Sequence, residues 1–396
     1  MKICLVSASI MIAGGVLADL PDYSIHWDIL EIHEQDGAAE VLDCFMQDGG
    51  TGFGVAYLSR QENRLEVWVL DLSGEGAPLN RRRVASDMAG WAVSRFADNS
   101  TLVLVHSSRD DAGPVIRFED LSRTEDSVEK SLTGLCPGAD NLTVRDMAVT
   151  GGGEILLTGS GETPGEGFRL FAGAVGMEGE PLWRTTLAEG ADGGMERAVI
   201  AGLEDGGCLV SWEPGYSSPG IPLFRVDPDG GVSWEILIRF DTGFEAGINS
   251  MQELRDGTIV CAGSFQHSFE MAERGFTVYL DPSGNELWRR VDWYLDRTSL
   301  TAVQEFGPAS LLLSGWTGFS GEFPFDASET DVLLAQLDTE RDMLTGCLVS
   351  GEGSQRPHSV FPTGDGEFTV IGEHTGEDGG GSGIFLGRAV IPDAPD

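Results

Sequence analysis

Basic residues are scarce in this 396-residue chain. Its 25 lysines and arginines are set against 64 aspartates and glutamates, which leaves a formal net charge of −39 at pH 7. Lysine is almost absent, since Lys2 and Lys130 are the only two. A nucleic-acid or anionic-lipid surface needs a positive field, so this composition excludes the first and argues against the second. The hydrophobic share of 41% is too high for a disordered acidic chain, so we expect a folded protein with an acidic coat.

Long apolar runs are also missing beyond the N-terminus, where no stretch approaches the roughly 20 residues of a spanning helix. Residues 1–18 carry Lys2, an apolar run and a small-residue end, Val16-Leu17-Ala18. This pattern predicts a secretory signal peptide cleaved after Ala18, which leaves 19–396 as the mature protein. We therefore expect a secreted or periplasmic protein without membrane insertion. The alternative is a buried N-terminal strand, which Lys2 and the Gly14-Gly15 pair disfavour.

Closely spaced cysteines are absent. Without Cys4, five remain at wide spacings, and no C-x-x-C pair exists, which excludes zinc-ribbon and thioredoxin-like sites. Cys208 and Cys261 fall at similar places in repeated strands. We therefore interpret them as small buried core residues and not as disulfide partners.

Glycine, by contrast, is abundant at 55 residues and punctuates a repeat. A short apolar strand recurs seven times, usually after a glycine-rich turn and often ending at glycine. Its last residues are Tyr57, His106, Gly159, Trp212, Gly263, Gly315 and Gly372. The successive spacings are 49, 53, 53, 51, 52 and 57 residues, which define seven units of nearly constant period.

Each unit reads as four strands. The segments 179–183, 230–234 and 284–288 share the form G-x-x-x-W, which predicts a tight hairpin turn and a Trp packed between neighbouring sheets. In the fifth unit the pattern predicts strands over 248–254, 258–265, 275–281 and 285–291. Four-stranded units at this period predict an all-β fold, a single seven-bladed β-propeller.

The seventh unit lacks a fourth strand, because it ends after a third strand near Ile391. Residues 24–30 (SIHWDIL) resemble residues 285–291 (NELWRRV). We predict that the mature N-terminal strand, about residues 22–32, completes the last blade and closes the ring. Closure removes two sheet edges that would otherwise favour aggregation.

The repeat, D-G-G before an apolar strand and then D-x-x-G-x-x-x-W, resembles that of exported bacterial β-propeller proteins, mostly uncharacterised. It is also similar to the repeats of PQQ-like propellers and lies in the kelch and WD length range, without the G-H…W-D signature. The PQQ-like resemblance implies a quinoprotein dehydrogenase or a periplasmic outer-membrane assembly factor. The chain departs from both. Such dehydrogenases resemble eight-bladed rings with an adjacent Cys-Cys pair, and the assembly factor is a lipoprotein with a lipid-accepting cysteine.

Candidate binding residues lie in the loops that join the second strand of a blade to the third. In a propeller, these loops and the connections between blades gather on one face around the central channel, here called the loop face. Aromatic rings beside carboxylates suit sugars or peptides, by stacking and hydrogen bonding. The candidates are His267, Phe269, Glu270, Trp316, Phe319, Phe323, Asp326, Glu373 and His374. The alternative is that the phenylalanines cap the interior of their own blades and that His267 is an ordinary surface residue.

Catalytic and cofactor signatures are absent. The chain has no G-x-S-x-G elbow, H-E-x-x-H pair or G-x-x-x-x-G-K loop. The acidic segments 227–231 and 373–383 do not reproduce a calcium-loop pattern, so we expect no metal and no cofactor. This favours a monomeric, non-catalytic binding module for a protein or carbohydrate partner. The rival hypothesis is a polysaccharide hydrolase or lyase that uses carboxylates or a histidine on the loop face.

The signal-peptide prediction is tested by the N-terminus of the exported protein. After expression in a bacterial host, we expect Edman sequencing or intact mass to place the first residue at Asp19, with the protein in the periplasm or medium. A full-length chain retained in the cytoplasm would contradict it.

Overall fold

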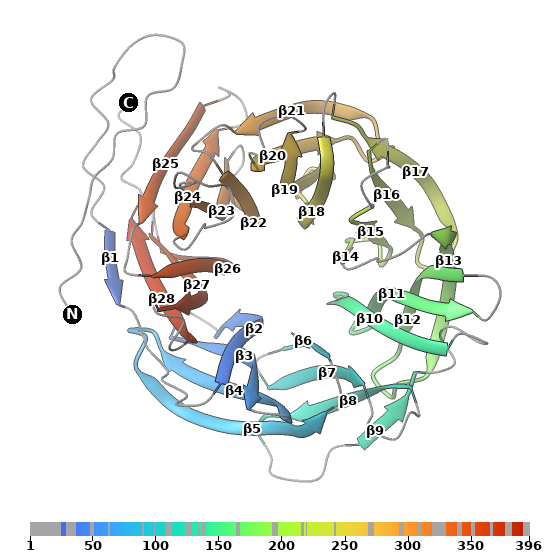
Figure 1. The fold of residues 1–396 in the computed structure, drawn as a ribbon, viewed down its shortest axis with the longest axis horizontal. Coiled ribbons are helices and arrows are strands. Elements are labelled where there is room, and N and C mark those ends of the chain that lie inside the picture. The colour runs from blue at the N-terminus through green and yellow to red at the C-terminus, as the bar shows by residue number, and fades with distance from the viewer. Residues whose placement is uncertain are drawn as a thin grey trace.

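The computed structural model shows a ring of seven β-sheets around a central axis (Figure 1). It describes residues 25–28, 37–47, 51–61, 64–88, 91–98, 100–107, 113–122, 128–132, 135, 140–163, 167–191, 197–214, 218, 220–240, 243–267, 273–292, 297–307, 310–318, 330–338, 343–349, 353–364, 367–376 and 382–390. No helix in these ranges is long and apolar enough to cross a membrane.

Each sheet is one blade of four antiparallel strands, named a to d from the axis outward. Blade 1 contains β2 (Gly37–Met46), β3 (Gly52–Gln61), β4 (Arg64–Ser73) and β5 (Pro78–Met88). Blade 2 contains β6 (Ala92–Phe96), β7 (Thr101–Ser107), β8 (Pro114–Asp120) and β9 (Val128–Ser131). Blade 3 contains β10 (Asp140–Val149), β11 (Ile155–Thr163), β12 (Gly167–Val175) and β13 (Pro181–Ala191). Blade 4 contains β14 (Ala198–Gly202), β15 (Cys208–Trp212), β16 (Ile221–Val226) and β17 (Val232–Ile238).

The remaining three blades complete the ring. Blade 5 contains β18 (Gly243–Glu253), β19 (Ile259–His267), β20 (Glu273–Leu280) and β21 (Glu286–Asp292). Blade 6 contains β22 (Arg297–Gly307), β23 (Ser310–Gly318), β24 (Thr330–Asp338) and β25 (Met343–Val349). Blade 7 contains β26 (Ser354–Gly364), β27 (Glu367–Thr375) and β28 (Ser382–Val390), with β1 (Ile25–Asp28) as its outermost strand.

The seven-bladed, all-β prediction is confirmed. β1 pairs antiparallel with β28, with Ile25 opposite Ala389, so an N-terminal strand closes the ring. In blade 5, three strands match the predicted ranges within a few residues, whereas β18 begins at Gly243, five residues before the expected start. The predicted signal peptide, residues 1–18, lies outside the described residues.

Apolar side chains fill the spaces between adjacent blades. One cluster joins Leu209 and Leu223 of blade 4 to Ile248, Ile259 and Phe276 of blade 5, and each of these side chains is buried. Cys208 and Cys261 are free and fully buried in such clusters, as predicted from the repeat. Burial of this apolar surface is the main favourable term in stacking one sheet on the next.

The G-x-x-x-W motif joins neighbouring blades at the outer rim. Trp183 packs against the turn of the next blade, where a Cβ at Gly230 would lie 3.0 Å from the indole ring. Trp234 packs in the same way on Gly284, and its Nε1 donates a hydrogen bond of 3.1 Å to the Pro282 carbonyl. Both glycines have φ near +85°, a conformation that favours glycine. The motif therefore combines a turn with the tryptophan that packs on the next turn.

Close backbone packing explains the glycine that recurs near the end of strand b in several units. In five innermost strands the pairing register shifts by one residue, a β-bulge, at the steps Val41/Asp43, Val144/Asp146, Ile248/Ser250, Leu300/Ala302 and Pro357/Ser359. In four of these blades, glycine lies opposite the bulge, and an added Cβ would meet a carbonyl oxygen at 2.0–2.2 Å. The four glycines are Gly159, Gly263, Gly315 and Gly372. The repeat thus preserves the space that the bulge needs.

Hydrogen bonds between a side chain of one blade and the backbone of the next occur at all seven interfaces. We call this set the inter-blade ring. Its bonds run from Phe96 N–H to Asp43 (2.7 Å), from Arg95 to Met147 carbonyl (2.8 Å), from Ile200 N–H to Asp146 (2.9 Å), from Glu204 N–H to Glu253 (2.7 Å), from Val303 N–H to Ser250 (3.3 Å), from Thr301 to Pro357 carbonyl (2.9 Å) and from Val41 N–H to Glu373 (2.7 Å). They give partners to backbone groups that lie outside the pairing within each blade.

We predict that Gly315→Ala destabilises the fold by about 1–3 kcal/mol, because the new methyl group must displace the Ser299 carbonyl at 2.1 Å. Gly307→Ala, at the turn end of the same hairpin, has no atom within 4 Å of the new Cβ and serves as the control. Urea denaturation measures both. Equal stabilities for the two variants would contradict the close-packing explanation.

Candidate functional site

A cavity of about 940 Å³ occupies the axis of the ring. It is lined mostly by residues of β18, β22 and β26 and by residues near the ends of β19, β23 and β27, with Arg95 of β6 and Arg197 and Glu213 of blade 4. These segments meet because strands a and b are antiparallel, so that Gly247 pairs with Ser264, Ser299 with Trp316 and Arg356 with Glu373. This channel cavity therefore lies toward the loop face.

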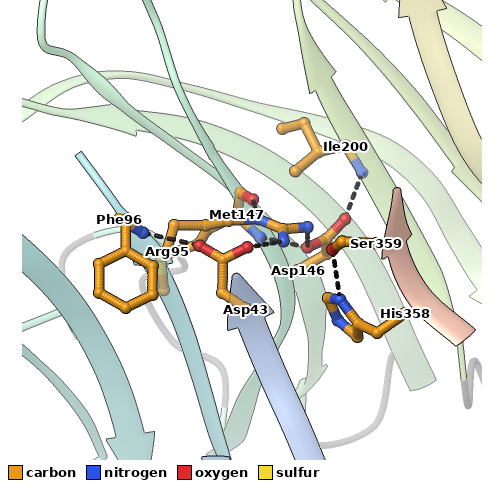
Figure 2. A network of polar contacts seen from close by, with 8 residues as sticks. All are labelled: Asp43, Arg95, Phe96, Asp146, Met147, Ile200, His358 and Ser359. Carbon is orange, nitrogen blue, oxygen red and sulfur yellow. Dashed lines mark hydrogen bonds and ion pairs between the residues drawn. The ribbon is translucent and has the colours of Figure 1, made fainter. Parts of the chain in front are cut away.

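At the centre of the wall, one arginine joins three blades (Figure 2). Arg95, on β6, donates to Asp43 of blade 1 at 2.8 Å and to Asp146 of blade 3 at 3.1 Å. Its Nε also donates to the Met147 carbonyl at 2.8 Å. The side chains of Asp43 and Asp146 are 10% and 11% exposed, and that of Arg95 is 31% exposed. Because Asp146 also accepts from Ile200 N–H, the network extends into blade 4.

Asp43 and Asp146 keep Arg95 positively charged. Burial alone lowers the pKa of the guanidinium, but the carboxylates of Asp43 and Asp146 outweigh burial and raise it. Loss of this arginine would leave two nearly buried carboxylates without a counter-charge. Arg95 is thus a fixed part of the wall, with its hydrogen-bonding capacity largely used by the protein.

His358 lies beside this network and is neutral at physiological pH. Burial, with a further contribution from the Arg95 charge, lowers the pKa of His358 to about 4. Its Nδ1 lies 2.8 Å from the Ser359 hydroxyl. The imidazole therefore contributes polarity to the channel cavity but no positive charge.

Three further arginines line the channel cavity: Arg197, Arg297 and Arg356. Arg297 pairs with Glu273 at 3.6 Å, and the other oxygen of Glu273 accepts from Ser264 at 2.8 Å. Arg356 of blade 7 lies over the ring of Trp316 of blade 6, 5.5 Å from its centroid. A cation over an indole face is held in place by the ring quadrupole. Arg197 precedes β14, and both Arg197 and Arg356 are exposed.

Glu373 lines the cavity and forms a hydrogen bond across the interface between blades 7 and 1. Its Oε1 accepts the Val41 N–H of blade 1, and Arg356 is its cross-strand neighbour. Burial raises the pKa of this carboxyl to about 7, and Glu40 adds to the rise, while the Val41 N–H and Arg356 oppose it. A carboxyl that titrates near neutrality in a cavity is a common feature of functional sites.

The sequence candidates are distributed as follows. Trp316 and Glu373 line the channel cavity together. They lie in β23 and β27 and not in loops, because strand b continues beyond the glycine at which the repeat was predicted to end. His374 is buried beside Gln355, with 3.4 Å between Nδ1 and the amide nitrogen, and is not part of the lining. His267 ends β19. The others lie outside the described residues: Phe269, Glu270, Phe319, Phe323 and Asp326.

The arginines were missed from sequence. A signal did exist for part of the central network, since Asp43 and Asp146 occupy the same position in blades 1 and 3, opposite Ala56 and Thr158 of strand b. Arg95 lies opposite Val103, two residues further along its strand, so the repeat does not mark it in the same way.

Arg197 and Arg356 share a position in their units, since each stands opposite the glutamate that follows the last residue of the strand-b repeat, Glu213 and Glu373. Arg297 lies at another position, opposite Gly318.

Metal binding finds no support in the part of the chain that the structure describes, where no group of three or more His, Cys, Asp and Glu side chains is placed to hold an ion. In the described c–d turn of blade 4, the carboxylates are used locally. Asp227 bonds with Ser233, and Asp229 accepts the Gly231 N–H at 3.1 Å. This acidic segment acts as turn structure.

Comparison with known proteins gives structural likeness without a family. No family model and no curated protein matches the sequence. Among solved structures, the chain is similar to the β-propeller domain of the Trilobed protease from Pyrococcus furiosus (14% identity, 90% of this chain and 100% of that one, TM-score 0.49). It is also similar to a protein of unknown function from Dyadobacter fermentans (12%, 94% and 100%, TM-score 0.49). A third is prolyl oligopeptidase B from Galerina marginata (11%, 86% and 47%, TM-score 0.49). The chain spans about half the length of the solved prolyl oligopeptidase and puromycin hydrolase chains.

The raised pKa of Glu373 predicts a pH-dependent stability. Because the folded-state pKa, about 7, exceeds the reference value of 4.5, stability from the protonated carboxyl is complete below about pH 4.5 and is lost as pH rises through 7. Glu373→Gln keeps an acceptor for Val41 N–H and cannot ionise. We expect it to be more stable than wild type at pH 8 by up to about 3 kcal/mol, and equal at pH 4.

Denaturant titrations at pH 4, 6 and 8 measure this difference. Glu367→Gln, an exposed carboxylate at the start of the same strand, is the control and should shift neither curve. A Glu373→Gln advantage that is independent of pH would contradict the assignment.

Proposed function

We propose that this protein is an exported, non-catalytic binding module that receives a polar ligand in the channel cavity at its loop face. The observation that carries the proposal is the cavity itself, about 940 Å³ in volume and lined mainly by charged and hydroxyl- or amide-bearing side chains. Ligand pockets commonly fall between 300 and 1,000 Å³, so this one accommodates a ligand of several sugar or amino-acid units. The export component is supported by the pattern of residues 1–18.

The rigidity of the wall supports binding. Asn249 donates to Ser299 at 3.2 Å and to the Leu300 carbonyl at 2.8 Å, across the interface between blades 5 and 6. Thr301 continues this pattern into blade 7. Side chains that are already ordered lose little entropy when a ligand binds, which favours affinity.

A second candidate is the glycan hydrolase or lyase, and the observation that favours it is Glu373. A carboxyl group with a pKa near 7 is suited to general-acid chemistry. Glycoside hydrolysis needs a second carboxylate. Glu273 lines the same cavity, but its two oxygens are engaged by Ser264 and Arg297. Glu213 lines the cavity as well.

A binding screen against glycan and peptide libraries tests the leading proposal. For any ligand detected, we expect Trp316→Ala to weaken binding at least tenfold, because the indole both lines the cavity and holds Arg356. Trp288→Ala, on outer strand β21, removes an equally large ring that contacts Tyr279 and serves as the control. Calorimetry gives both affinities.

Two results would overturn the proposal. Ligand binding that survives Trp316→Ala in a folded variant would place the site elsewhere. Release of reducing ends or unsaturated products from a bound glycan, abolished by Glu373→Gln, would establish the enzyme in place of the binding module.

A further inference from the structure

We propose that the ligand is an acidic oligosaccharide whose carboxylate or sulfate groups bind Arg197 and Arg356 on opposite walls of the channel cavity. This inference rests on the proposed function, since it names the class of ligand for the same cavity.

The distribution of charge is the first argument. The chain holds 64 acidic residues and 25 basic ones, yet four arginines line the channel cavity against three glutamates, Glu213, Glu273 and Glu373. Asp43 and Asp146 add two carboxylates that are already bound to Arg95, so acids and bases are close to balance around the cavity, and most of the acidic excess lies elsewhere. A local cluster of guanidinium groups attracts anions most strongly where protein walls reduce screening by solvent.

Two of the four arginines remain available to a ligand. Arg95 is bound by Asp43 and Asp146, and Arg297 is paired with Glu273. Arg197 and Arg356 are exposed and form no ion pair with a carboxylate of the described residues. These two side chains are therefore the cations that an incoming anion meets.

Arg356 is prepared for this role by its neighbours. Trp316 holds the guanidinium from one side, which leaves its planar edge for a bidentate carboxylate or sulfate. The neighbouring Glu373 competes for the same charge only when it is ionised. Because burial raises the pKa of Glu373 to about 7, this competition is incomplete at neutral pH and absent in acid.

The positions of the two arginines indicate a ligand with more than one anionic group. Arg197 immediately precedes β14 of blade 4, and Arg356 lies in β26 of blade 7, on opposite sides of the ring (Figure 1). Both line one continuous cavity. A chain of acidic sugar units presents such repeated charges along its length.

The rest of the lining favours a sugar over an acidic peptide. Ser250, Gln266 and Gln304 offer hydroxyl and amide groups, which match the many hydroxyls of a sugar. An extended peptide would instead seek backbone partners along a strand edge. On the innermost strands, several of those groups are already bonded to side chains, including the N–H groups of Phe96, Ile200 and Val303.

Calorimetry on the mature protein tests the inference with four probes of similar length: an oligogalacturonate, a heparin-derived oligosaccharide, a neutral cello-oligosaccharide and an oligo-glutamate peptide. We expect one or both acidic sugars to bind at least tenfold more tightly than the other two probes. The carboxylated and sulfated probes distinguish the two sources of negative charge.

Matched variants locate the binding. Arg197→Gln and Arg356→Gln should each weaken acidic-sugar binding at least tenfold. Arg255→Gln removes the same charge from an a–b turn at the opposite end of the ring, where the side chain is 84% exposed, and should change affinity less than twofold. Thermal unfolding confirms that each variant is folded. Arg356→Lys, which keeps the charge but loses the fork, should bind more weakly than wild type and more tightly than Arg356→Gln.

The possible failures are distinguishable. Preferred binding of the neutral sugar or of the peptide, sensitive to Trp316→Ala but not to the arginine variants, would overturn the ligand class and leave the binding site in place. Absence of acidic-sugar binding also overturns the inference. Binding of any probe that is insensitive to Trp316→Ala would overturn the proposed function itself.

Discussion

The inter-blade ring, the hydrogen bonds between a side chain of one blade and the backbone of a neighbouring blade, is the constraint on which the rest of this structure depends. A propeller blade buries both faces only when its neighbours are in place, and each innermost strand presents an edge to the axis that no further strand covers. Here side chains of a neighbouring blade supply partners for backbone groups near that edge. Each bond holds one blade in register with its neighbour along the axis. Examples are the bonds from Phe96 N–H to Asp43, from Arg95 to Met147 carbonyl, from Ile200 N–H to Asp146, from Val303 N–H to Ser250 and from Val41 N–H to Glu373.

The same constraint shapes the candidate site. Bulges in the innermost strands re-aim the backbone, and glycines opposite them leave room for it. Polar side chains therefore line the axis because the backbone needs them there, and the resulting wall is charged and ordered. Arg95 and Glu373 illustrate the double role, since each joins blades and lines the cavity. Arg197 and Arg356 do not bridge blades in this way among the described residues, and they give the wall its accessible positive charge.

Much of the fold could be predicted from sequence, because its determinants are local and repeated. Tight turns, short apolar strands and the G-x-x-x-W segment recur at nearly constant spacing, and Trp183 and Trp234 pack as that motif predicts. Strand b is longer than the repeat predicts. Trp316 and Glu373 follow a glycine that makes room for the bulge of strand a, and the strand continues beyond it. The cavity was less predictable. Arg197, Arg297 and Arg356 come from three blades, so only the closed ring brings them together.

Some of the many acidic residues have a structural role in the turns of the blades. Acidic side chains stabilise turns, as Asp205 does by accepting Gly207 N–H at 2.8 Å, and bonding of this kind to the backbone and to Arg225 keeps the pKa of Asp205 low. In the proposed function, the acidic turns face solvent and the arginines of the channel cavity contact the ligand.

A crystal structure of the protein with its tightest-binding ligand tests the central claim most directly. The account predicts ligand density in the channel cavity at the loop face, between Arg197 and Arg356 and in contact with Trp316. Density on the outer rim or at the opposite end of the channel, with the cavity left to solvent, would contradict it.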